Sequence, residues 1–216
     1  MENSFIYTYH GNGSVADEIA VVDGIMNGTY RRYFENGILE IDGVVENNKF
    51  HGDFVFYNPD GVVIRTCTFA DGLLHGVLLE YDNNQIQSKT DYLFGKVHGV
   101  FEFFGKQGNI LLHSDYLENK KNGNTTTYSD KGKKIKTEQY KDDVLHGVTI
   151  VYHEDGVTAK EKISYYLGKF HGDCIQYNSA GAAIHIVTFE HGVLVQSKKD
   201  VSEINRTPQG VWVKQG

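Results

Sequence analysis

The sequence has few of the residues that would indicate a secreted or membrane-spanning protein. Among 216 residues there are two Cys, two Pro, two Met and one Trp. Cys67 and Cys174 are too few for a disulfide framework, so we expect a reducing, cytoplasmic location. The first residues lack a basic segment followed by an apolar run, and no apolar run approaches the ~18 residues of a membrane span.

Positive charge is also scarce, with 21 Lys and Arg against 28 Asp and Glu, a formal net charge of -7. The averaged field therefore repels phosphate-rich polymers and anionic bilayers. We expect no nucleic-acid partner and do not expect a membrane partner. By contrast, 24 Gly, 14 Tyr and 12 Phe favour strands and tight turns over helices.

A His-Gly or Asn-Gly pair recurs along the chain, and we call its second residue the anchor glycine. The spacing between successive anchors is 24, 24, 23, 24, 24 and 25 residues. An aromatic residue follows each anchor at offset +5. The anchors are Gly28, Gly52, Gly76, Gly99, Gly123, Gly147 and Gly172, and the aromatics are Tyr33, Tyr57, Tyr81, Phe104, Tyr128, Tyr152 and Tyr177.

Two further positions in each repeat carry residues that tolerate a left-handed backbone. One is a glycine at offset +9, which Asn84 replaces in the 23-residue repeat. The other lies four residues before each anchor and is Gly, Asn or Asp. Both positions predict turns, and the segments between them alternate like strands. Each repeat is therefore strand, turn, strand, turn.

Stacked repeats of this kind predict an all-β fold: an elongated single-layer antiparallel meander of about eight β-hairpin repeats. We expect the array over residues 1–196, with repeats starting near residues 4, 28, 52, 76, 99, 123, 147 and 172. Residues 197–216 should form a polar tail. Its strand at residues 210–214 should cap the open sheet edge, which otherwise invites aggregation.

The repeat resembles the MORN repeat, in the bacterial variant of the YwqK-like antitoxin family. The resemblance is carried by residues 52–61, 69–76, 140–147 and 166–172, and it extends over roughly residues 28–195. Asn27 and Asn122 depart from it by replacing the histidine before the anchor. The resemblance implies a docking surface, a membrane-proximal scaffold, or an antitoxin or immunity protein.

The histidines that precede the anchors do not predict a metal site, and we expect no cofactor. Equivalent atoms in successive repeats should lie roughly 10 Å apart, whereas zinc binds nitrogen at about 2.1 Å. These histidines are His51, His75, His98, His146 and His171. Because no phosphate-binding loop, paired carboxylates or activated nucleophile is evident, we expect no catalytic activity.

Alternation along the strands separates two faces of the sheet. We expect the aromatics at offset +5 on the packed face, which places offsets +2 and +4 on the other face. There, Phe54, Phe56, Phe101 and Phe103 form either an exposed partner-binding patch, to which Trp212 belongs, or a surface that curling of the sheet or the tail strand buries.

The leading hypothesis is a protein-binding scaffold of antitoxin or immunity type. An acidic surface fits a basic toxin, such as a nuclease or a nucleic-acid deaminase. One alternative is docking on anionic lipid through Lys131, Lys133, Lys134 and Lys136. Another is a purely structural rod, and the open edges of the sheet also permit dimerisation.

Overall fold

The sheet predicted from the repeats is present. The structure is a computed structural model that describes residues 3–199, 204–206 and 212–214. Among these residues there is no helix. A total of 21 strands form one open antiparallel sheet, and two more form a separate pair.

The chain divides into an N-terminal unit, residues 1–110 and 116–119, and a C-terminal unit, residues 111–115 and 120–216. The strands up to the boundary are β1 (Asn3–Tyr9), β2 (Val15–Val22), β3 (Ile25–Tyr33), β4 (Leu39–Glu46), β5 (Lys49–Phe50), β6 (Gly52–Tyr57), β7 (Val63–Ala70), β8 (Leu73–Leu74), β9 (Gly76–Asp82), β10 (Gln85–Leu93), β11 (Lys96–Phe104) and β12 (Ile110–Leu117). They continue as β13 (Lys120–Tyr128), β14 (Lys134–Lys141), β15 (Val144–Leu145), β16 (Gly147–Tyr152), β17 (Ala159–Tyr166), β18 (Lys169–Phe170), β19 (Gly172–Tyr177), β20 (Ala183–Glu190), β21 (Val193–Lys199), β22 (Ile204–Arg206) and β23 (Trp212–Lys214).

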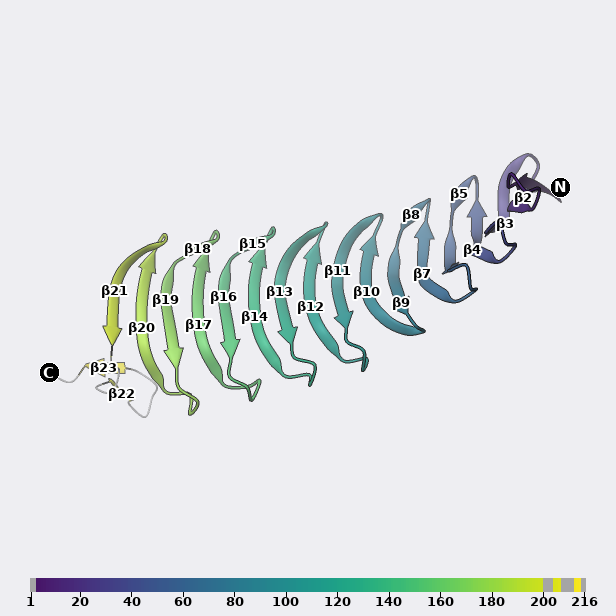
Figure 1. Cartoon of the computed structure of the whole chain (residues 1–216). Coiled ribbons are helices and arrows are strands. Elements are labelled where there is room, and N and C mark those ends of the chain that lie inside the picture. Colours follow the sequence, from purple (N-terminus) through teal and green to yellow (C-terminus); the bar gives the residue numbers. More distant parts are fainter. Residues whose placement is uncertain (1–2, 200–203, 207–211, 215–216) are drawn as a thin grey trace. The chain divides into compact units, whose positions relative to one another are not determined.

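Within each unit, every long strand pairs with the next along the chain, as in β1 with β2 and β2 with β3. In the C-terminal unit the same order continues through β19, β20 and β21. Figure 1 shows these neighbouring hairpins. The short strands β5, β8, β15 and β18 are each followed by one residue outside the strands, the histidine before the anchor glycine, and then by a longer strand.

The turn before each anchor is a two-residue hairpin turn with two left-handed residues. In the turn after β4, Asn47 and Asn48 have φ of 49° and 64°. Two positive φ values are the signature of a type I′ turn, whose twist matches that of the flanking strands. The 23-residue repeat uses the same solution at its other end, where Asn83 and Asn84 have φ of 48° and 63°. This two-residue turn is shorter than the turn that carries the glycine at offset +9 in the other repeats. It explains why this repeat is one residue shorter and lacks that glycine.

A β-bulge recurs next to the aromatic at offset +5. Phe56 pairs with Arg65 and Tyr57 pairs with Val63, so that Ile64 is an extra residue in β7. The same shift of register occurs before Tyr9, Tyr33, Tyr128, Tyr152 and Tyr177. A bulge bends its strand and increases its twist, and the strands in Figure 1 are visibly curved.

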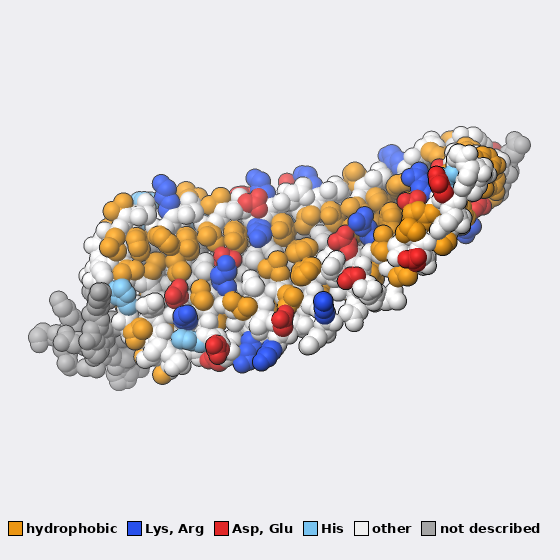
Figure 2. All heavy atoms as spheres, viewed as in Figure 1, with side chains coloured by type: hydrophobic (Ala, Val, Ile, Leu, Met, Phe, Trp, Pro, Cys, Tyr) orange, Lys and Arg blue, Asp and Glu red, His pale blue; other side chains and the backbone are white. Residues whose placement is uncertain are grey.

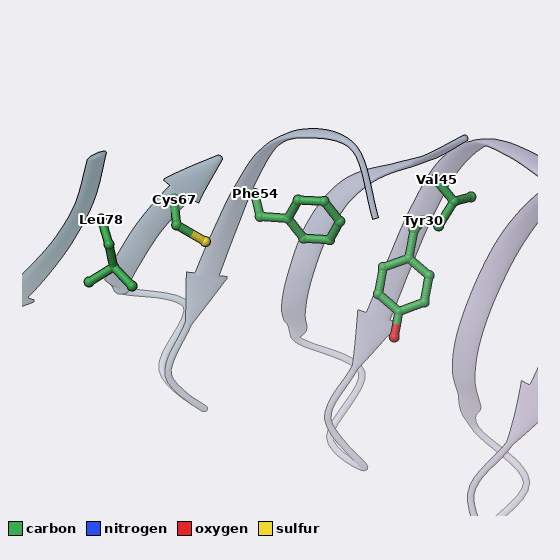
Figure 3. Close-up of a cluster of buried hydrophobic side chains, with 5 residues drawn as sticks. All are labelled: Tyr30, Val45, Phe54, Cys67 and Leu78. Carbon is green, nitrogen blue, oxygen red and sulfur yellow. The ribbon is translucent and has the colours of Figure 1, made fainter. Parts of the chain in front are cut away.

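The packed face is the face of offset +2, and the expectation that the +5 aromatics form it is wrong. Tyr30, Phe54 and Leu78, all at offset +2, are buried together with Val45 and Cys67 (Figure 3). The +5 tyrosines are only partly buried. Alternation separates the two faces correctly, but it does not tell which of them the curved sheet encloses.

The C-terminal end differs from the expectation. The strand β23 pairs with β22, with Trp212 opposite Arg206, and these two strands form a sheet of their own. The expected pairing of this strand with the open edge is therefore wrong. The last strand of the large sheet is β21, which reaches three residues into the segment expected to be a tail.

Candidate partner-binding surfaces

Phe54 belongs to the core rather than to an exposed patch. Its side chain is 1% exposed. Its ring lies 4.7 Å from that of Phe50 and 4.9 Å from that of Phe69, measured between centroids. Gly43 leaves the space for it, because a Cβ there would lie 2.4 Å from the ring. Since this side chain is enclosed, the sequence-based assignment of Phe54 to a partner surface is wrong.

The other phenylalanines proposed as contact residues differ in their burial and in their neighbours. Phe56 packs against the same core, with the guanidinium of Arg65 5.7 Å from its ring centroid. The ring of Phe101 is partly buried and lies 6.5 Å from that of Tyr116. Phe103 is 38% exposed. The side chain of Trp212 lies outside the described residues. The four phenylalanines therefore do not form a contiguous exposed patch.

The lysines proposed for lipid docking surround one turn of the C-terminal unit. Lys131, Lys133 and Lys134 are exposed. The Nζ of Lys133 donates a hydrogen bond to the carbonyl oxygen of Glu154 at 3.0 Å. Lys136 is half-buried on β14 and pairs with Glu138 at 2.9 Å. Three of the four ammonium groups thus lie at a turn, and the fourth is neutralised within the sheet.

Three of the histidines before the anchors, His75, His146 and His171, pack against aromatic rings near the type I′ turns. The ring of His75 lies 4.6 Å from that of Phe94, and the rings of His146 and His171 lie 5.1 and 5.6 Å from that of Tyr166, measured between centroids. His171 also stacks at 4.8 Å on His191, which the sequence reasoning did not single out. The described residues bring together no group of three or more potential metal ligands. The geometry favours a packing role.

Charge is distributed unevenly between the two units. The N-terminal unit has 16 Asp and Glu against 7 Lys and Arg, a formal charge of -9. The C-terminal unit has 12 against 14, a formal charge of +2. Glu35, Asp60 and Asp82 are exposed at three successive turns of the N-terminal unit. A charge count per repeat would have revealed this asymmetry, which the average over the whole chain conceals.

The +2 position changes character along the chain. It is Tyr30, Phe54 and Leu78 at the start, but Cys174 in the last repeat. Beside Cys174 lies a partly open hollow of about 260 Å³. Its lining residues are Glu161, Lys162, Ile163, Phe170, Cys174, Ile175, Gln176, His185, Val187 and Phe189. Figure 2 shows hydrophobic side chains gathered in a band across the strands of the C-terminal unit.

The two thiols, both free, differ in their surroundings. Cys67 is buried in the core, and desolvation raises its pKa to about 11. Such a thiol stays protonated and cannot act as a nucleophile near neutral pH. Cys174 is only partly buried and lines the hollow.

In the N-terminal unit, burial alone would raise the pKa of Asp17, but hydrogen bonds from Thr8 and Arg32 outweigh it and lower that pKa.

A known repeat family matches one part of the chain. The family described as MORN repeat variant matches residues 26–47, and no curated protein matches the chain. Among the described residues there is no helix long and apolar enough to cross a membrane. The matched segment covers nearly all of β3 and all of β4. The chain therefore contains a MORN repeat variant at residues 26–47, within a scaffold built from recurring hairpins of the same strand and turn pattern.

Proposed function

We propose that the chain is a non-enzymatic, protein-binding repeat scaffold of antitoxin or immunity type, which neutralises a basic partner by occluding it. The observation that carries the proposal is the formal charge of -9 on the N-terminal unit. Glu35 and Asp60 lie on adjacent turns, which are joined by a hydrogen bond from Asn36 to the carbonyl oxygen of Pro59. Fixed, exposed carboxylates of this kind accelerate encounter with a positively charged protein.

A nuclease or a nucleic-acid deaminase fits the charge of this surface, because its substrate groove must attract phosphate. Occlusion needs no chemistry from the scaffold. The buried, protonated thiol of Cys67 is consistent with that role, since it offers no nucleophile. We place the complex in the cytoplasm, where the two free thiols would remain reduced.

The test is coexpression with the basic product of a neighbouring reading frame, scored by copurification and by protection of growth. The decisive variant carries Glu35→Lys and Asp60→Lys. The matched control carries Asp130→Lys and Glu154→Lys, which are exposed at equivalent turns of the C-terminal unit. We expect the first pair to lower the association rate about tenfold at low salt and the second pair to have little effect. Equal effects of the two pairs, or no protection by the wild type, would contradict the proposal.

A second candidate is docking on anionic lipid through the C-terminal unit. The formal charge of +2 and the exposed Lys131, Lys133 and Lys134 at one turn favour it. Each lysine near an anionic surface contributes about 1 kcal/mol. Sedimentation with phosphatidylserine vesicles at low salt should show binding that is lost when the three lysines become glutamate. If the wild type stays in the supernatant, this candidate is wrong.

A further inference from the structure

The repeats provide an internal comparison for the hollow beside Cys174. In the repeat of Gly52, Phe54 packs against both Phe50 and Phe69, which lie at offsets -2 and +17 from the anchor and 5.5 Å from each other. In the repeat of Gly172 the same two offsets hold Phe170 and Phe189, whose rings lie 5.1 Å apart. The residue at +2 is a cysteine there, so the aromatic pair is retained, whereas the third ring that packs against the pair in the repeat of Gly52 is absent.

The repeat of Gly28 shows which other groups border this position. Tyr30, at offset +2, directs its hydroxyl group toward Asp17 at 3.4 Å, and Asp17 lies at offset -11. In the repeat of Gly172 the residue at -11 is Glu161, which lines the hollow. Ile19, opposite Tyr30, lies at offset -9, as Ile163 does in the last repeat. An isoleucine at this offset is therefore compatible with a ring at +2.

The hollow is large enough for such a ring. Its volume is about 260 Å³, whereas an apolar cavity of about 150 Å³ can bind benzene. Phe170, Phe189 and Val187 supply apolar walls, and Glu161, Gln176 and His185 add polar groups. A phenol matches this combination, because its ring is apolar and its hydroxyl group needs a hydrogen-bond acceptor.

We propose that this hollow binds the side chain of a tyrosine presented by the protein partner, with the hydroxyl group donating a hydrogen bond to the Glu161 carboxylate. The inference rests on the proposed function, because it names the group by which the partner is anchored. Aromatic side chains that fill a pocket dominate binding energy at many protein interfaces. The residues that line the site all belong to the C-terminal unit.

The experiment uses the full chain and small probes in place of the partner. N-acetyl-tyrosinamide is titrated while the methyl signals of Ile163 and Val187 are followed by NMR, and N-acetyl-phenylalaninamide is titrated in parallel. We expect saturable shifts with a dissociation constant of about 1 mM for the tyrosine probe. The phenylalanine probe should bind about tenfold more weakly, since it lacks the hydrogen bond to a charged acceptor.

Three variants sharpen the test. Cys174→Tyr fills the hollow from within and should abolish the shifts, whereas Cys174→Ala keeps the hollow open and should retain them. Glu161→Gln should bring the two probes to within about threefold of each other, because the charged acceptor is lost. Protection of Cys174 from a thiol reagent by the tyrosine probe gives a second measurement that does not depend on the stability of any variant.

Several results would overturn the inference: no saturable shift in the wild type, equal affinity for the two probes, or shifts that persist in Cys174→Tyr. Binding that appears only in Trp212→Ala would identify an intramolecular occupant and would also overturn it. The two proposals fail separately. If a partner copurifies but the probes do not bind, only the tyrosine site is refuted. If the probes bind but no basic partner is found, the proposed function is refuted.

Discussion

At the scale of the residue, the core depends on a glycine that leaves space for a large side chain on a neighbouring strand. Phe54 is accommodated because Gly43 has no Cβ, which would otherwise lie 2.4 Å from the ring. The sequence shows both residues, but they lie on different strands, and only the register of β4 and β6 brings them together. The burial of Phe54 therefore could not be predicted from the repeat alone.

Gly43→Ala should destabilise the protein by about 1–3 kcal/mol, because overpacking forces the core to shift. Gly11→Ala is a suitable control, since no atom lies within 4 Å of a Cβ at that position. Denaturant unfolding of both variants measures the difference. A Gly43→Ala protein as stable as the control would show that Phe54 is not packed as described.

The two cysteines should react differently with a thiol reagent at pH 8. We expect Cys174 to be labelled in the folded protein and Cys67 only after unfolding, which mass spectrometry of digested protein can show. Burial raises the pKa of Cys67 to about 11 from its ordinary value of 9.0. The stability linked to this shift is complete below pH 9 and is lost as the pH rises toward 11. Rapid labelling of Cys67 at pH 8 would contradict its burial.

At the scale of the element, turns and faces could be predicted, whereas curvature could not. Glycine and asparagine spacing located the turns because only a few residue types tolerate a positive φ. Alternation placed Tyr57 and Phe56 on opposite faces. The bulge at Ile64, which bends the strand, has no comparably constant residue type: its counterparts include Glu40 and Lys160. Sequence therefore did not show which face is enclosed.

Consecutive type I′ turns are joined by hydrogen bonds that depend on residue type. The Oδ1 of Asn48 accepts a bond from the N–H of Met26 at 2.9 Å, in addition to the backbone bond from Asn48 to Met26. Gly72 occupies the equivalent place with the backbone bond to Phe50 alone. We expect Gly72→Asn to stabilise the protein by about 0.5–1 kcal/mol.

The matched change is Gly72→Ala, which cannot make this bond. It should destabilise the protein, because φ at this position is 81°. Thermal unfolding of the two variants should move in opposite directions. A loss of stability in both would show that the side-chain bond between turns contributes little.

At the scale of the whole molecule, the sequence predicted one antiparallel sheet but not how its last segment pairs or how its charge is divided. The pairing of β23 with β22 instead of the sheet edge leaves β1 and β21 as the terminal strands of the sheet. In β1, Phe5, Ile6 and Tyr7 are 46–50% exposed. This strand, NSFIYTY, has none of the charges that protect edge strands from self-association.

We therefore predict concentration-dependent dimerisation by antiparallel pairing of β1 with its counterpart in a second copy. Ile6→Lys should raise the dimer dissociation constant at least tenfold, since it places two like charges opposite each other. Val195→Lys, on the exposed β21, is the control and should have little effect. Sedimentation velocity at several concentrations decides the matter, and a dimer that survives Ile6→Lys would refute this mode of pairing.

The central claim is that offset +2 lies on the packed face from the repeat of Gly28 to the repeat of Gly172, and that the space beside it is left unfilled in the last of these repeats. The measurement that tests it directly is the free energy of unfolding of Tyr30→Cys and Cys174→Tyr. We predict that Tyr30→Cys loses about 3–5 kcal/mol, as expected for removal of a buried ring, whereas Cys174→Tyr is at least as stable as the wild type. Comparable losses in both variants, or no loss in Tyr30→Cys, would contradict the account.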